Sequence, residues 1–278
     1  MNKITAILFI ITVILTSCVN DNHHRNMAIK ERIRSVDALF EGSKVEQAAK
    51  YMKRDDYKSI KKFFKNNPDI LVDTQSPFTG ATLLQVASAR KKQNAVKALL
   101  EFGADPNFEE LEIGSQSWSS FTHAFFTRDT MLLKLYIKYG ADVNKVSEMK
   151  STLFRTPLIA ASKAELSLVK FLISHGADSH YVYTKNNESA LNAAILSADI
   201  DVVNYLIFEQ KVDFKKPYYY NKPITAGLRN ICYPIGSRKH QEKMKLVSFL
   251  KENDIDYYAE PIPKRFYKLF DEDYLSKY

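Results

Sequence analysis

The side chains of this 278-residue chain that could perform chemistry are few and scattered. The sequence contains no H-E-x-x-H zinc motif, no nucleophile elbow and no phosphate-binding glycine loop. The adjacent His23 and His24 have no further ligand-type residue at a matching spacing, so they predict a polar segment and not a metal site. The remaining histidines lie far apart in the sequence, at His123, His175, His180 and His240. We therefore expect no enzyme activity, no metal and no cofactor.

The two cysteines differ in their surroundings. Cys18 comes just after Ile4 to Thr16, thirteen residues without charge. Such a segment is too short to span a bilayer comfortably but has the length of a signal-peptide core. Cys232 would be left without a cysteine partner after export, so we expect no disulfide. We predict that Cys232 is buried and packs as a small apolar side chain.

The segment Leu15-Thr16-Ser17-Cys18 resembles the bacterial lipobox. The resemblance implies a signal peptide over 1–17, cleavage before Cys18 and attachment of lipid to that residue. A polar tether over 18–28 would follow, and Val19 in place of aspartate implies an outer-membrane location facing the periplasm. The alternative is an ordinary secretory signal with a chance cysteine.

Beyond this leader, the chain is organised around short pairs of helices. In the clearest unit, Thr156 to Asp178, a threonine N-cap precedes a proline at the first helical position. The small Ala160 and Ala161 would let a second helix, from about Glu165 to Ser174, lie close. Gly176 then predicts a left-handed C-terminal cap.

This unit recurs along the chain. Three G-A-D triplets end at Asp105, Asp142 and Asp178, with spacings of 37 and 36 residues. The first-helix alanines recur at intervals of 37, 37 and 33 residues, at Ala87, Ala124, Ala161 and Ala194. A hydrophobic content of 45%, with only 8 glycines and 9 prolines, argues against a long disordered segment.

The pattern resembles the ankyrin repeat, T-P-L-H-x-A followed by V-x-x-L-L-x-x-G-A-D-x-N. The resemblance implies an all-α solenoid of about six helix-turn-helix repeats over residues 29–278. An N-terminal cap would include Ile29 to Phe40, and a C-terminal capping helix would span Lys264 to Leu275. The family's histidine position instead holds Gln85, Thr122, Ile159, Asn192 and Thr225.

Three features predict irregular repeats. Asn67 replaces the capping glycine of the first repeat and is expected to adopt the same left-handed conformation. Lys211 occupies the corresponding place in a later repeat and predicts a weakened cap. About eleven extra residues around Asn230 to His240, with Pro234 and Gly236, predict a loop inside the last repeat.

Members of the resembled family bind partners through the hairpin tips after each G-A-D and through the concave face. Tyrosine and tryptophan are enriched at binding hot spots. The first of the tips carries tryptophan near glutamates, and the third and fourth carry tyrosines, in the fourth beside lysines. The alternative is that these rings pack back on the repeat below. The candidate partner-binding residues are Trp118, Tyr181, Tyr183, Lys215, Lys216, Tyr218, Tyr219 and Tyr220.

Charge is unevenly distributed along this chain of formal net charge +8. Between Lys215 and Lys251 nine lysines or arginines accompany one acid, Glu242, whereas acidic residues gather near the first tip. A basic patch with aromatic residues could bind nucleic acid. Because the leader predicts export, an acidic protein or an anionic membrane surface is the better expectation, and we expect no nucleic-acid partner.

These observations predict a protein-binding lipoprotein of the bacterial cell envelope, held in the bilayer through Cys18. Bacterial ankyrin lipoproteins of this form resemble immunity proteins that neutralise secreted antibacterial toxins, such as lipases delivered by a type VI secretion system. The resemblance implies a stoichiometric inhibitor whose partner, a toxin or lipase, is encoded next door. The alternative is an envelope scaffold that organises endogenous periplasmic or membrane proteins.

Overall fold

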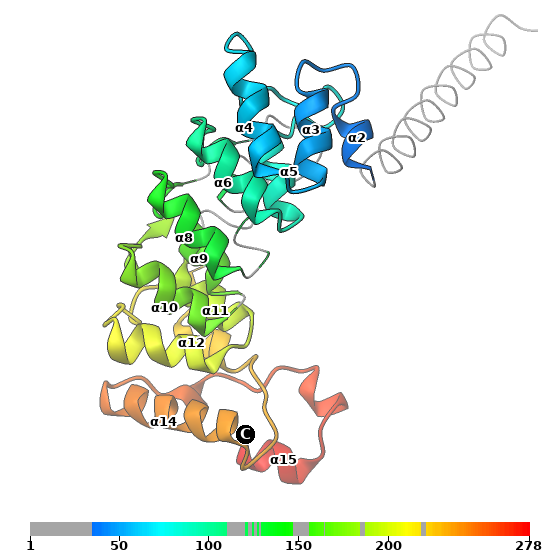
Figure 1. Cartoon of the computed structure of the whole chain (residues 1–278). Helices are drawn as coiled ribbons and strands as arrows, with labels where there is room; N and C mark the ends of the chain where they lie inside the picture. Colours follow the sequence, from blue (N-terminus) through cyan, green and yellow to red (C-terminus); the bar gives the residue numbers. More distant parts are fainter. Residues whose placement is uncertain are drawn as a thin grey trace, which may run out of the picture. The chain divides into compact units, whose positions relative to one another are not determined.

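The computed structural model describes residues 35–109, 120–121, 124, 127, 129–146, 156–163, 165–183, 187–217 and 221–278. The chain divides at Gly140 into two compact units, called unit 1 and unit 2 here. Figure 1 shows that both units are built from short helices stacked in layers. None of the helices in these described ranges has the length and hydrophobicity needed to cross a membrane.

The described part of unit 1 begins with the short helix α2 (Val36–Leu39), which packs on α3 and buries both Val36 and Leu39. Helix pairs follow: α3 (Glu46–Lys53) with α4 (Tyr57–Asn66), and α5 (Leu83–Ala89) with α6 (Gln93–Glu101). In the third pair the described residues are the helical Ser120, Phe121 and Ala124 and then α8 (Thr130–Lys138).

Unit 2 continues the same arrangement. Its pairs are α9 (Pro157–Ala161) with α10 (Leu166–Ser174), α11 (Ala190–Leu196) with α12 (Ile200–Asn204), and α13 (Ile224–Leu228) with α14 (Arg238–Glu252). Two-residue strands, β1 (Val182–Tyr183) and β2 (Glu188–Ser189), pair antiparallel with Val182 opposite Ser189. Unit 2 also contains a π-helical turn, η1 (Tyr205–Glu209). It ends with the 3₁₀ turns η3 (Tyr257–Ala259) and η4 (Phe266–Lys268) and the helix α15 (Glu272–Lys277). The described residues therefore hold five complete helix pairs and the second helix of another, in keeping with the predicted array of about six repeats.

The first helices begin where side-chain caps are available. Thr82 and Gln85 form a reciprocal capping box, in which the Thr82 hydroxyl accepts from the Gln85 amide and the Gln85 side chain accepts from the Thr82 amide. The Thr156 and Ser189 hydroxyls cap α9 and α11 by accepting from the amides of Ile159 and Asn192. Each such cap stabilises a helix by about 1 kcal/mol. At Gln85 the capping box therefore occupies the position that holds histidine in the repeat pattern.

Small residues set the distance between neighbouring helices. Ala87, Ala124, Ala161 and Ala194 are all fully buried, with 0% of their surface exposed. A methyl side chain at these sites lets the next layer approach closely, and a close-packed interior has no spare volume there. The predicted register of the repeats is therefore confirmed at the alanine positions that the sequence singles out.

The C-terminal caps follow the predicted pattern with one exception. Gly103, Gly140 and Gly176 have φ of +86°, +90° and +92°, and Lys211 is also left-handed at +57°. A side chain in this region is disfavoured, so Lys211 forms the weaker cap that the sequence predicts.

The prediction for Asn67 is wrong, because its φ is −131°. Asn67 precedes Pro68, and a residue before proline is pushed toward extended backbone. Its side-chain amide instead donates to the Phe63 carbonyl at 2.8 Å and so satisfies the end of α4.

One extra residue in the fifth helix pair produces the π-helical turn. Twelve positions separate the left-handed Lys91 from Gly103 in the second pair, but thirteen separate the left-handed Ala198 from Lys211. The surplus residue widens the helix at Tyr205–Glu209, where Gln210 donates to the Tyr205 carbonyl and not to that of Leu206.

The last repeat and the C-terminal cap differ from expectation in their helix boundaries. The inserted segment is irregular only to Ser237, because the Ser237 hydroxyl caps α14 and makes Arg238 the first of fifteen helical residues. The predicted capping helix from Lys264 to Leu275 is interrupted. It forms the 3₁₀ turn η4 and then α15, which begins after Asp271 because the Asp271 carboxylate accepts from the Tyr274 amide.

Candidate protein-binding sites

One tip of unit 2 is the hairpin between α10 and α11. After Asp178, whose carboxylate accepts from the His180 amide at 2.8 Å, the chain enters β1 and returns through β2. Of the predicted contact residues, Tyr181 directly precedes β1 and Tyr183 is its last residue, and both are half-buried. Successive residues of a strand point to opposite faces, so Val182 and Tyr183 point to opposite faces of the hairpin.

The next tip follows η1 and carries the predicted lysines. The Asp213 carboxylate accepts from the Lys215 amide at 2.9 Å and holds a turn on which Lys215 and Lys216 are exposed. Phe214 in the same tip packs edge-to-face against Phe249 of α14, with ring centres 5.3 Å apart. This ring therefore serves packing, as the alternative interpretation of the tip aromatics proposes.

A pocket of about 80 Å³ lies between the two tips. It brings together Tyr181 and Lys216, which are 35 positions apart in the sequence, whereas Tyr183 and Lys215 do not line it. Its walls also include polar side chains that can donate or accept hydrogen bonds: His180, Asn187, Ser189, Asn192 and Asp213. We call this arrangement the tip pocket. An aromatic ring beside a cation and several polar groups suits an acidic or polar side chain of a protein partner.

The other candidate residues lie outside the described parts of the chain. These are the proposed lipidation site Cys18, Trp118 of the first tip, and Tyr218, Tyr219 and Tyr220. Cys232 is half-buried, so the expectation of a buried apolar residue there is only partly met. Within the described residues no group of three or more His, Cys, Asp or Glu could hold a metal ion.

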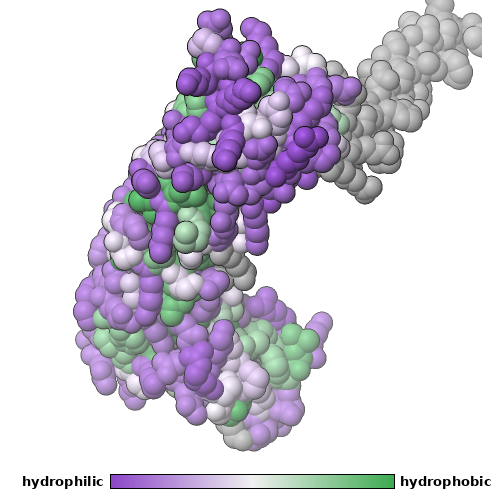
Figure 2. All heavy atoms as spheres, viewed as in Figure 1, coloured by the Kyte–Doolittle hydropathy of each residue, from purple (hydrophilic) through white to green (hydrophobic). Residues whose placement is uncertain are grey.

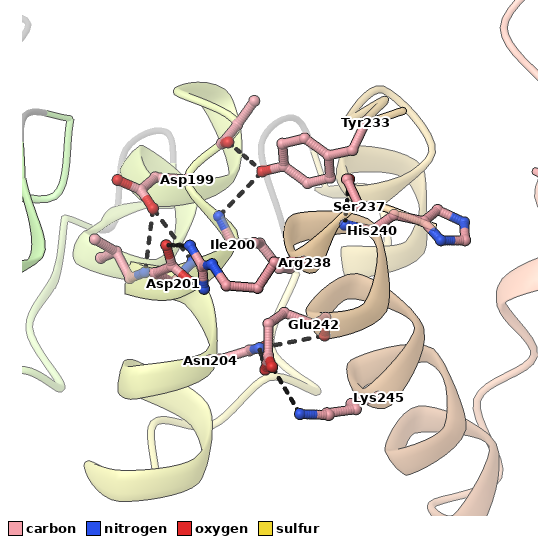
Figure 3. Close-up of polar contacts among 12 residues, drawn as sticks. Asp199, Ile200, Asp201, Asn204, Tyr233, Ser237, Arg238, His240, Glu242 and Lys245 are labelled. Carbon is pink, nitrogen blue, oxygen red and sulfur yellow. Dashed lines mark hydrogen bonds and ion pairs between the residues drawn. The ribbon is translucent and has the colours of Figure 1, made fainter. Parts of the chain in front are cut away.

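A second surface lies where α14 packs on α12. Arg238 donates through both terminal nitrogens to the two carboxylate oxygens of Asp201, each at 2.7 Å, as Figure 3 shows. Asn204 donates to the Glu242 carbonyl at 3.2 Å, and Lys245 pairs with the Glu242 carboxylate at 2.6 Å. The hydrogen bonds from Arg238, with its charge, hold the pKa of Asp201 below its usual value. An open groove of about 490 Å³ runs beside these pairs.

Tyr233 anchors the inserted segment to the preceding repeat. Its hydroxyl donates to the Ala198 carbonyl and accepts from the Ile200 amide at 3.2 Å (Figure 3). Burial raises the pKa of Tyr233 to about 12. The sequence identifies the insertion but gives no signal for this contact, because the partner atoms belong to the backbone of another repeat.

The predicted basic patch between Lys215 and Lys251 is smaller in the structure than in the sequence. Arg229 and Lys243 are buried, with 5% and 2% of their surface exposed. Arg229 donates to the carbonyls of Glu260 and Tyr278, at 3.0 and 2.9 Å. Two of the nine cations therefore serve the interior of unit 2, and two more, Arg238 and Lys245, are paired with acids.

Lys243 occupies an aromatic enclosure. Its Nζ donates to the Ile231 carbonyl at 2.7 Å and lies 5.1 and 4.1 Å from the ring centres of Tyr257 and Tyr278. Burial, with a smaller effect from the charge of Arg229, lowers the pKa of Lys243 to about 7. The residues that enclose Lys243 come from the C-terminal segment, so a sequence count of charges cannot identify this group as buried.

Comparison with known proteins identifies the repeats. A family model for ankyrin repeats in three copies matches residues 121–217, and a single ankyrin-repeat model matches residues 79–110. Among solved structures, the ankyrin repeat domain of Bcl-3, described as a unique member of the IkappaB protein family, matches with a TM-score of 0.57. The two sequences are 18% identical over 74% of this chain and 85% of that one. No curated protein matches the sequence.

The fold is therefore the ankyrin-repeat fold, a solenoid of helix-turn-helix repeats. Residues 79–110 and 121–217 are ankyrin repeats, and the further helix pairs described here extend the same pattern on both sides. Ankyrin repeats are protein-interaction modules, and their stacked units present extended surfaces to partners.

Proposed function

We propose that this protein is a lipid-anchored, non-enzymatic binder of another protein in a bacterial cell envelope. The tip pocket carries this proposal, because it joins Tyr181 and Lys216, two residues that the sequence already marks as candidate contacts. Such an aromatic ring offers large contact area at low rotamer cost. The lipobox at Cys18 supports the envelope location. We further propose that the anchor lies in the outer membrane and that the protein faces the periplasm.

Within this class, a stoichiometric inhibitor is the preferred function. A tethered binder with decorated tips suits an immunity protein that neutralises a secreted antibacterial toxin, such as a type VI secretion lipase effector. The second candidate is an envelope scaffold that organises endogenous proteins. Coexpression with the product of the neighbouring gene separates the two, since an immunity protein should abolish the toxicity of that product and a scaffold should not.

Anchoring is tested at Cys18. Cys18→Ser should leave the chain unprocessed or move it out of the membrane fraction, and it should abolish labelling by a fatty-acid analogue. Cys232→Ser is the matched control, because it removes the other cysteine and should change neither property. Unchanged fractionation of Cys18→Ser, with no labelling of the parent protein, would contradict the anchor.

Partner binding is tested at the tip pocket by calorimetry against the product of the neighbouring gene. Tyr181→Ala with Lys216→Ala should weaken binding by at least about 2 kcal/mol, as hot-spot residues do. The matched control is Tyr267→Ala with Lys268→Ala, an exposed tyrosine–lysine pair in the C-terminal cap of the same unit.

The remaining tip candidates belong in the same binding series. Trp118→Ala should weaken partner binding by a similar amount. The combined alanine substitution of Tyr218, Tyr219 and Tyr220 should do the same. Charge reversal at Lys215 and Lys216 should mainly slow association and lose its effect in high salt. If every tip variant binds like the parent, the partner uses the concave face or the inserted segment, and the tip assignment is wrong.

A further inference from the structure

The outer side of unit 1 carries an unusual concentration of one residue type. The second helices of its pairs pack in sequence, α4 against α6 and α6 against α8. Figure 2 shows hydrophilic residues covering the part of unit 1 where Figure 1 places α4. Six of the eleven exposed residues on these three helices are lysines, called the lysine face here: Lys58, Lys62, Lys65, Lys97, Lys134 and Lys138. The other five are Asn66, Gln93, Asn94, Thr130 and Met131.

The charge of the lysine face is not compensated within its own helices. Glu101 is the single acid on α4, α6 and α8, and it accepts from Lys61 Nζ at 2.8 Å and from the Tyr57 hydroxyl. The hydrogen bond from Lys61 and, to a smaller extent, the one from Tyr57 hold the pKa of Glu101 below its usual value. Glu101 is therefore ionised and already paired. None of the six face lysines forms an ion pair with any residue that the structure describes.

The rows of lysines are joined by half-buried tyrosines. Lys61 and Lys97, on adjacent helices, lie 5.2 and 5.5 Å from the centre of the same Tyr57 ring. Tyr139, just after α8, reaches Glu101 with its hydroxyl at 3.5 Å, and its ring lies 5.6 Å from Lys138 Nζ. The three helices therefore present one continuous surface of like charge, held together by contacts beneath it.

The composition of this surface distinguishes between possible partners. Protein interfaces are depleted in lysine and use aromatic or arginine anchors, but the exposed set contains one apolar residue, Met131, and no ring. Single-stranded nucleic acid is bound by stacking on free aromatic side chains, whereas Tyr57 and Tyr139 are half-buried and already in contact with lysines and Glu101. Lysine is a point charge that suits a diffuse field of anions more than a single bidentate contact. Anionic lipid headgroups are such a field.

We propose that the lysine face lies against the anionic headgroups of a bilayer. The inference rests on the proposed function for its setting, because the lipid on Cys18 would supply the proximity. Sixteen residues lie between Cys18 and Ser35, and this connection can extend to at most about 60 Å. This tether keeps unit 1 at a high effective concentration beside the membrane. Contact through the second helices leaves the first-helix side of unit 1 turned away from the bilayer and open to a partner.

The test measures vesicle binding by the mature chain without its lipid, residues 19–278, which retains every described element. The parent should bind vesicles containing 30% phosphatidylglycerol in phosphatidylcholine at 50 mM salt and should not bind pure phosphatidylcholine. Each lysine near an anionic surface strengthens binding about fivefold, so Lys58→Gln with Lys62→Gln and Lys65→Gln should weaken it about 100-fold. The corresponding triple arginine variant should bind like the parent, because the charge is kept.

The matched control is Lys251→Gln with Lys264→Gln and Lys268→Gln, three exposed lysines of unit 2. This control should bind vesicles like the parent, and an equal loss would show that net charge and not the lysine face is responsible. Absence of binding to anionic vesicles, or tighter binding to single-stranded RNA than to vesicles at equal salt, would overturn the proposal. Because the assay uses neither the anchor nor the partner, such a failure leaves labelling at Cys18 and partner binding at the tip pocket to be judged separately.

Discussion

Raising the pH from 7.5 to 9.5 should stabilise unit 2 through Lys243, the buried lysine of α14. Burial lowers the pKa of Lys243 from 10.5 to about 7 in the folded protein. Between these two values the unfolded chain binds a proton that the folded chain does not, so the free energy of unfolding rises with pH. Above about pH 10 the direction reverses, because burial raises the pKa values of Tyr257 and Tyr278 and only the unfolded chain ionises them there.

The magnitude follows from the width of the window. Each pH unit between the two pKa values is worth about 1.4 kcal/mol. The interval from 7.5 to 9.5 lies wholly inside the window, so the expected gain in unfolding free energy is about 2.5 kcal/mol. Two contacts oppose this gain, since the Ile231 carbonyl and the ring of Tyr278, 4.1 Å away, both favour the ammonium form.

The measurement is urea unfolding followed by far-UV circular dichroism at four pH values across this interval. In Lys243→Met the dependence on pH should disappear. That variant also loses the hydrogen bond to Ile231, worth about 1 kcal/mol, so the slopes and not the absolute stabilities are compared. Lys245→Met, an exposed neighbour on the same helix, should keep the parent's slope. A parent without the rise, or Lys243→Met with an undiminished rise, would refute the assignment of a neutral lysine in the interior.

Three further changes test the packing. Ala161→Leu should lower the unfolding free energy by about 1–3 kcal/mol, because it overpacks a fully buried site; Leu196→Ala, at an exposed position, should change it by less than about 0.5 kcal/mol. An unchanged melting temperature for Ala161→Leu would contradict the register. Lys211→Gly should stabilise the array by up to about 1 kcal/mol, since φ is +57°, whereas Lys211→Ala should not. Tyr233→Phe should cost about 1–2 kcal/mol in a thermal melt, and a smaller loss would mean that the insertion is not anchored through this hydroxyl.

The arrangement of helix pairs could be predicted because its signals are local and repeated. An N-cap such as Thr156, a proline behind it and a left-handed glycine such as Gly176 act within a few residues of the chain. Asn67 was mispredicted although the local signal was present, because the effect of Pro68 on the preceding residue outweighs the tolerance of asparagine for a left-handed cap. The surplus residue before Lys211 is also countable in the sequence, but its form as a π-helical turn is not.

The candidate site was predictable only as a set of residue types. Tyrosines and lysines on tips mark a binding edge, yet Tyr181 and Lys216 meet because two consecutive repeats pack side by side. In the same way the sequence counts seven lysines on α4, α6 and α8, but only the stacking of those helices makes six of them one exposed face.

The sequence by itself determined the repeat and most of the caps at which its helices start and stop, since these depend on backbone preferences and on side chains within one turn. The tertiary structure alone decided which charges face water. Arg229 and Lys243 belong to the same run of basic residues as Lys215 and Lys216, but the returning segment that carries Tyr257 and Tyr278 encloses the first two and leaves the second two exposed. Burial of a charge depends on atoms that lie tens of residues away along the chain, and no local pattern specifies where those atoms come to lie.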